Sequence, residues 1–125
     1  MNPTDRYYTK EHEWIRLDDS GIGIIGITDH AQCELGDVVY VELPGVGSTI
    51  KSMEKMGEIE SVKAVSELFS PVSAEVLEQN EDILDSPEKV NEDPFGSGWL
   101  VKVKLTNESE LENLMNADEY TALTT

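Results

Sequence analysis

The chain has 125 residues, of which 26 are acidic and nine are basic, so its formal net charge is −17. Nucleic acid and the anionic inner face of a membrane both attract basic clusters, and the sequence has none, so neither is an expected partner. No apolar run approaches the roughly 18 residues of a membrane-spanning helix, and we expect no signal or transit peptide, because only a few polar residues precede the first ordered-looking segment. Cys33 is the only cysteine, which excludes an internal disulfide and fits a reducing compartment. We expect a monomeric, cytoplasmic protein.

Short β-branched and apolar runs, separated by turn residues, predict strands along most of the chain. The clearest run is 99–105, where apolar and basic side chains alternate with period two. The expected strands cover residues 14–17, 22–27, 38–43, 49–51, 57–62, 67–70, 74–79 and 99–105. Many short strands at close spacing are typical of a small sandwich or barrel.

Helical signals interrupt this pattern first after residue 27. Thr28 or Asp29 can cap a short helix, and Gly36 lies where that helix would end.

A second change of period follows residue 105. Ser109 and Glu112 have the spacing of a capping box, and a further short helix over 116–123 would begin at Asn116 or Asp118. No linker divides the chain. We therefore expect one domain over residues 1–125, with a β core over about 7–105 and a helical segment over about 106–125.

The sequence offers little support for catalysis. His12 and His30 are the only histidines, and there is no glycine-rich phosphate loop or zinc-ligand spacing. His30 and Cys33 are three residues apart, but two mixed ligands make a weak site, because closed zinc sites use four. The oxygen-rich stretch 82–93 lacks the spacing and central glycine of a calcium loop. We expect no catalytic residues and no metal.

Lys63 differs from the other six lysines in its surroundings. It lies between two expected strands, and its neighbours Val62, Ala64 and Val65 are small or apolar. A lysine at the tip of a tight hairpin presents its amine to solvent, where a modifying enzyme can reach it. From spacing alone, an ordinary exposed turn lysine is the alternative and the more common case.

The segment GEIESVKAVSELFSPVSAEV resembles the lipoyl-lysine hairpin of lipoyl carrier domains. Further motifs narrow the resemblance to the H proteins of the glycine cleavage system: YTKEHEWIRL, GITDHAQ, LGDVVYVELPGVGSTIK, NEDPFGSGWLVKVKL and the acidic C-terminus with EYTAL. The resemblance extends from Tyr8 to about Leu123. It implies a mainly β fold, the barrel-sandwich hybrid of biotinyl/lipoyl carriers, with an extra N-terminal hairpin, a short internal helix and C-terminal helices.

The resemblance also implies a non-catalytic carrier with lipoic acid covalently bound to Lys63. In this family a glycine decarboxylase (P protein) places an aminomethyl group on the lipoyl sulfur, and a tetrahydrofolate-dependent aminomethyltransferase (T protein) removes the carbon. Dihydrolipoamide dehydrogenase (L protein) then reoxidises the dithiol, and a lipoylating enzyme attaches the arm. Glu60, Ser61, Val62 and Ala64 match the lipoylation motif, and we expect Glu60 and Ala64 to help that enzyme position the lysine.

Two glutamates match a family cleft that shelters the loaded arm. Glu13, in the H-E-W motif, matches a cleft acid and could bind the cationic amine by a charge-assisted hydrogen bond. Glu67 occupies a position often filled by Asp. The alternatives are a strand-edge charge at Glu13 and a solvated hairpin residue at Glu67.

Three positions depart from the family pattern. Met53 and Ala74 stand where glycine is usual, and a side chain there is costly if the backbone φ is positive. We expect the local turns to have adjusted. The pair Cys33-Glu34 differs from the family's variable pair at the end of the short helix, so contacts from that corner are not carried over.

Two other functions remain open. The same lysine would serve a relay that passes octanoyl or lipoyl groups to 2-oxoacid dehydrogenase carriers, and an unmodified acidic scaffold is the third possibility. Residues 75–93 carry eight acids and one base, a net −7, so we expect partners with basic docking surfaces.

Overall fold

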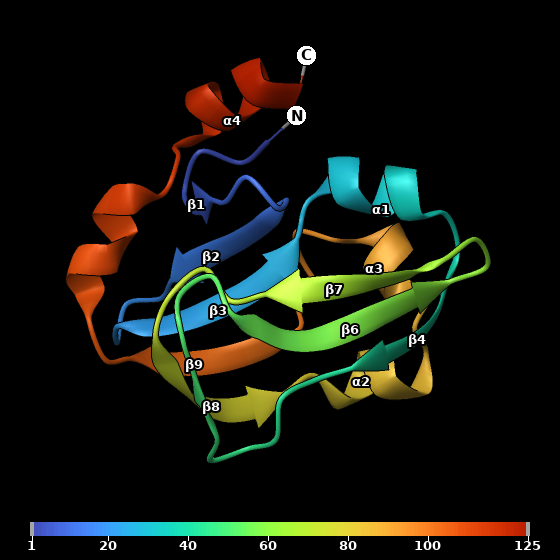
Figure 1. Ribbon diagram of the computed structural model, residues 1–125, viewed down its shortest axis with the longest axis horizontal. Coiled ribbons are helices and arrows are strands. Elements are labelled where there is room, and N and C mark those ends of the chain that lie inside the picture. The colour runs from blue at the N-terminus through green and yellow to red at the C-terminus, as the bar shows by residue number, and fades with distance from the viewer. Residues whose placement is uncertain (1, 125) are drawn as a thin grey trace.

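The computed structural model describes residues 2–124 and consists of two antiparallel β-sheets with short helices around them (Figure 1). One sheet has six strands in the order β1-β2-β3-β9-β8-β5, and the other has three in the order β4-β6-β7. The strands are β1 Tyr7–Tyr8, β2 Glu13–Leu17, β3 Ile22–Ile27, β4 Val38–Glu42, β5 Thr49–Ile50, β6 Lys55–Ser61, β7 Val65–Phe69, β8 Ala74–Gln79 and β9 Val101–Leu105. The expected mainly β sandwich is confirmed. Met1 and Thr125, the ends of the expected domain, lie outside the described residues.

The helices are short and lie at the edges of the sheets: α1 Asp29–Leu35, α2 Glu81–Asp85, α3 Lys89–Glu92, the 3-10 helix η1 Glu108–Asn113, and α4 Ala117–Thr124. α1 begins and ends as predicted. The Thr28 hydroxyl accepts the N–H of Ala31, and Gly36 ends the helix with a φ of +81°.

The hydrophobic core lies between the two sheets. Strands of the six-stranded sheet contribute Ile15, Ile25, Val76, Val101 and Val103, and the three-stranded sheet contributes Val41, Ile59 and Leu68. All of these side chains are buried in one cluster. Because side chains alternate between faces along a strand, the opposite face of the three-stranded sheet is left exposed.

The C-terminal segment corrects one helix prediction. Residues 108–113 form a 3-10 helix capped by Asn107, not an α-helix begun by Ser109. The Glu110 carboxylate accepts the N–H and hydroxyl of Ser73 at 2.7 and 2.9 Å, and this tertiary contact fixes the short helix against the sheet. The cap of α4 is Asn116, as one alternative predicted, with reciprocal hydrogen bonds to Glu119.

Met53 and Ala74, which stand where the family usually has glycine, differ in their backbone conformation. Met53 has a φ of +63°, so the expectation that the turn had adjusted is wrong there, and the side chain adopts a left-handed backbone that favours glycine. Its N–H donates to the Ser70 carbonyl at 2.7 Å, which holds the turn in this conformation. Ala74 is a buried residue of β8 and has no positive φ.

Candidate functional site

The hairpin tip between β6 and β7 presents Lys63. Glu60 pairs with Val65, and Ser61 donates its N–H to the Ala64 carbonyl at 2.8 Å, so only a tight turn remains at residues 62–63. Val62, Lys63 and Ala64 are all exposed. The structure therefore brings the five predicted motif residues together at one exposed end of the sheet.

The buried side chain of Ser61 stabilises this turn by hydrogen bonds to its backbone. Its side chain is buried, and its hydroxyl accepts the N–H groups of Lys63 and Ala64 at 3.1 and 3.2 Å. A side-chain acceptor at the start of a turn replaces a backbone carbonyl and stabilises the bend. Of the motif residues, Ser61 thus has a structural role that is visible in its own contacts.

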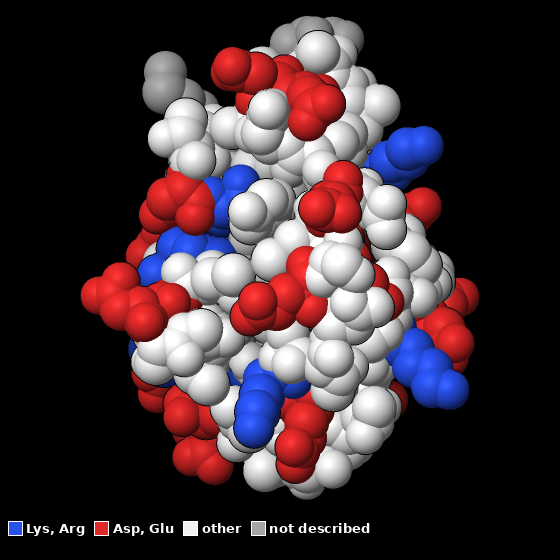
Figure 2. Space-filling model, turned by 90° about the vertical axis from the view of Figure 1, so that its left-hand side faces the viewer, with Lys and Arg blue, Asp and Glu red and all other residues white. Residues whose placement is uncertain are grey.

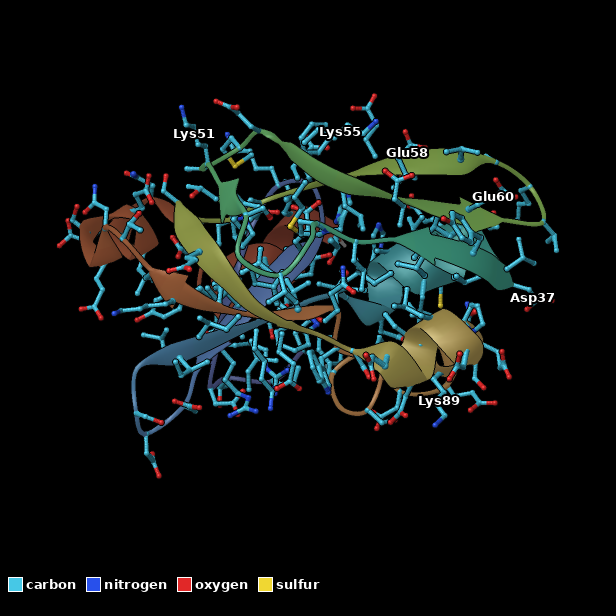
Figure 3. All side chains as sticks on the ribbon, turned by 90° about the horizontal axis from the view of Figure 1, so that it is seen from below. Asp37, Lys51, Lys55, Glu58, Glu60 and Lys89 are labelled. Carbon is cyan, nitrogen blue, oxygen red and sulfur yellow. The ribbon has the colours of Figure 1, made fainter. Side chains whose placement is uncertain are left out.

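The tip rests on the junction between α1 and β4. The Lys63 ammonium donates to the Glu34 carbonyl at 3.2 Å, and Val62 donates its N–H to the Asp37 carbonyl at 3.0 Å. Figure 3 shows Asp37 near the turn of the hairpin, with Glu58 and Glu60 projecting from the exposed face of β6. The root of the Lys63 side chain is thereby fixed, although its amine is open to solvent.

A cavity of about 280 Å³ lies beside the hairpin. Its wall contains Ala64 of the tip, Glu34 of α1, and both predicted cleft acids, Glu13 and Glu67. Glu11 adds a fourth carboxylate, and among the described residues no lysine or arginine lines the cavity. Such a wall favours a cationic group over a neutral or anionic one.

Glu13 is the buried acid of this wall, with 1% of its surface exposed. The Thr9 hydroxyl donates to its Oε1 at 2.7 Å, and the Phe69 N–H donates to its Oε2 at 3.2 Å. Burial raises the pKa of Glu13 to about 7, although both hydrogen bonds act in the opposite direction. Glu13 is thus the first residue of β2, as the strand-edge alternative expects, but it is buried and not solvated. Glu67 is exposed and lies opposite Glu58 across the β6–β7 pair.

His12 also lines the cavity, although the sequence analysis assigns it no role. It has a φ of +71°, and its Nδ1 lies 2.8 Å from the hydroxyl of Tyr120, a residue of α4. Burial and the neighbouring His30 lower the pKa of His12. The only sequence signal for His12 is its place in the H-E-W motif. Its contact with Tyr120 could not be predicted, because the two residues are 108 positions apart.

His30 and Cys33, which the sequence analysis considers as a weak candidate pair of metal ligands, each contact a different neighbour. The His30 Nε2 lies 2.9 Å from the Glu34 carboxylate, and the exposed Cys33 thiol accepts from Gln32 at 3.2 Å. Residues 2–124 contain no group of three or more His, Cys, Asp or Glu side chains that could hold a metal ion. None of the helices described is long and apolar enough to cross a membrane.

The chain is similar to glycine cleavage H proteins over nearly its whole length. The family model described as Glycine cleavage H-protein matches residues 6–125. A glycine cleavage system H protein of Carboxydothermus hydrogenoformans is 53% identical, covering 97% of this chain and 92% of the relative, and one of Rubrobacter xylanophilus is 56% identical, covering 94% and 90%. The crystal structure of a glycine cleavage system H protein from Mycobacterium marinum superposes with a TM-score of 0.87 at 41% identity, covering 97% of both chains.

Proposed function

The chain belongs to the glycine cleavage H-protein family, and on that premise we propose that Lys63 is the residue to which its lipoyl group is attached. Members of the family are lipoyl carriers of the glycine cleavage system and not catalysts themselves. When bound, the lipoyl group supplies a redox-active disulfide whose sulfur can hold a one-carbon unit.

The observation that carries the assignment is the presentation of the Lys63 amine. It is exposed at the tip of a turn that Ser61 stabilises, and the tip is anchored to the α1–β4 junction. A modifying enzyme needs an accessible amine on a backbone that does not move, and this arrangement supplies both. The neighbours Glu60, Val62 and Ala64 are exposed around it, where such an enzyme would contact them.

The cavity beside the hairpin is the proposed shelter for the arm. Its carboxylates fit a bound ammonium group, and the buried Glu13 provides a fixed acceptor next to the partly apolar wall of Ile27, Leu35 and Ile59. Glu67, at the exposed side of the same cavity, is the second proposed contact.

We propose four partners for this carrier: glycine decarboxylase, the aminomethyltransferase, dihydrolipoamide dehydrogenase and a lipoylating enzyme. A tethered arm that visits each enzyme in turn reaches a high effective concentration without tight complexes. The free, exposed thiol of Cys33 supports a reducing compartment, and with it a cytoplasmic location.

Lipoylation tests the assignment directly. The wild-type chain, incubated with a lipoate-attaching enzyme, ATP and lipoate, should gain the mass of one lipoyl group on the peptide that contains Lys63. Lys63→Arg should gain none and should reduce glycine cleavage turnover to background, while its circular dichroism spectrum stays unchanged because the side chain is exposed.

Lys51→Arg is the matched control, since Lys51 is also an exposed lysine. It should be modified and active like the wild type. Modification of the Lys63→Arg variant at another lysine, or an unmodified wild type, would refute the assignment.

A further inference from the structure

The side chain of Asn91, on α3, ties together the corner on which the lysine hairpin rests. Its Oδ1 accepts the Val38 N–H at 2.8 Å, at the start of β4. Its Nδ2 donates to the Gly36 carbonyl at 2.9 Å and to Gln32 Oε1 at 3.0 Å, at the end of α1. One carboxamide thus joins three elements, and both of its N–H groups are used.

The same corner carries both contacts of the hairpin tip with its surroundings. The Glu34 carbonyl accepts the Lys63 ammonium, and the Asp37 carbonyl accepts the Val62 N–H. Both carbonyls lie within the segment 34–38 that Asn91 spans. α3 packs against α1, and none of the three side-chain hydrogen bonds of Asn91 goes to Lys63.

Asn91 supplies hydrogen bonds that link segment 36–38 to α3. Val38 at the start of β4 pairs with Ser61 of β6, and a register shift between Val38 and Tyr40 interrupts the regular ladder just beyond this pair. Gly36 has a φ of +81°, and a Cβ on it would lie 2.9 Å from the Lys63 side chain. The junction therefore combines a permissive backbone with close contact to the lysine, and the hydrogen bonds of Asn91 add a restraint from α3.

We propose that Asn91 is a positioning residue for the lipoyl-lysine: it holds the α1–β4 junction so that the Glu34 and Asp37 carbonyls fix the hairpin tip. The proposal rests on the assignment of Lys63 above, but its physical core can be measured on the unmodified protein. The amide hydrogen exchange of Val62 reports the anchoring contact directly.

Asn80 provides the matched control. It also makes three side-chain hydrogen bonds: it accepts the Asp82 N–H and donates to the carbonyls of Ser97 and Trp99. Its partners lie on α2 and in the loop before β9, so none of these three hydrogen bonds reaches segment 34–38. Asn80→Ala and Asn91→Ala should therefore lower the urea midpoint comparably and differ only at the hairpin.

In Asn91→Ala we expect Val62 amide exchange to accelerate about tenfold or more, and kcat/KM for lipoylation to fall about fivefold, whereas both should stay within about twofold of wild type in Asn80→Ala. Asn91→Asp keeps the acceptor for Val38 and loses both donors. In this variant the Val38 amide should stay protected from hydrogen exchange, whereas the Val62 amide should exchange faster. That result would show that the hydrogen bond from Asn91 to the Gly36 carbonyl is the one that anchors the tip.

Unchanged Val62 exchange in Asn91→Ala, or equal acceleration in both alanine variants, would overturn the proposal. Faster exchange without any fall in lipoylation efficiency would overturn the role in presenting the lysine. Failure of wild-type lipoylation would instead refute the assignment of Lys63, and the exchange result would still decide whether Asn91 anchors the tip.

Discussion

Glu13 shows how one buried residue differs from the surface charges around it. Most of the 26 acids face water, but Glu13 lies on β2 against the cavity wall with two donors. Two hydrogen bonds do not offset its desolvation, so burial raises its pKa from 4.5 to about 7. Near neutral pH the cavity can therefore gain or lose a negative charge.

This pKa predicts a pH-dependent cost of folding. The folded state binds the proton more tightly than the unfolded state, so the stabilisation is complete below pH 4.5 and is lost as the pH rises through about 7. A shift from 4.5 to about 7, at about 1.4 kcal/mol per pH unit, amounts to roughly 3 kcal/mol. Glu13→Gln, which carries no charge, should gain stability relative to the wild type by up to that amount between pH 5 and pH 8.

Urea unfolding of both proteins at the two pH values measures the change. Glu67→Gln is the control, because this exposed carboxylate lines the same cavity, and it should shift the free energy of unfolding by less than about 0.5 kcal/mol at either pH. A Glu13→Gln difference that is the same at pH 5 and pH 8 would contradict the raised pKa.

Among the elements, α4 is joined to the cavity wall through its residue Tyr120, which contacts His12. Tyr120 is fully buried and stacks on Tyr8 of β1 with ring centroids 4.8 Å apart. Its hydroxyl lies 2.7 Å from the Thr28 hydroxyl and 2.8 Å from His12 Nδ1. The C-terminal helix thus contacts the cap of α1 and a cavity residue at the same time.

Tyr120→Phe separates the hydrogen bonds from the stacking. The ring remains against Tyr8, while Thr28 and His12 each lose a buried partner, so we expect a loss of about 1–3 kcal/mol in the free energy of unfolding. Faster amide exchange in α4 should accompany it. Thr121→Ala, which removes only an exposed hydrogen bond to Asn2, should change stability by less than about 0.5 kcal/mol. Equal effects of the two substitutions would contradict this role of the hydroxyl.

Across the whole molecule, one strongly acidic segment lies close to the lysine hairpin. Residues 75–93, with a net −7, continue from β8 into α2 and α3, which pack against β4 and α1 beside the hairpin. The opposite end shows lysine and arginine among the acids (Figure 2). Acidic side chains of residues 75–93 therefore lie close to the end that presents Lys63.

The acidic segment 75–93 predicts salt-sensitive encounters with basic partner surfaces. Glycine cleavage turnover at subsaturating carrier should fall severalfold between about 50 and 300 mM NaCl, because salt screens long-range attraction. At saturating carrier the effect should vanish, since encounter no longer limits the rate. Replacing Glu81 and Asp82 by Gln and Asn should flatten the salt dependence. Turnover independent of salt at low carrier concentration would contradict the prediction.

Local rules allowed much of this molecule to be predicted from sequence. The strand over 74–79, the Thr28 cap and the Gly36 stop need only neighbours within a few residues, and the structure has them as predicted. The two-residue strand β1 was missed, because its place depends on pairing with β2 and on a bridge from Tyr8 to Met115. The short helices α2 and α3 were missed as well, since residues 80–93 carry no clear helical period.

The candidate lysine, its motif and the mainly β fold could be read from the chain alone, because each depends on local spacing and on resemblance along the chain. The burial of Glu13, the positive φ of Met53 and the hydrogen bonds of Asn91 at the corner beneath Lys63 became visible only in the folded molecule. Those properties depend on partners many residues away. Burial, backbone strain and hydrogen-bond partners are set by what the folded chain brings together, which no local pattern encodes.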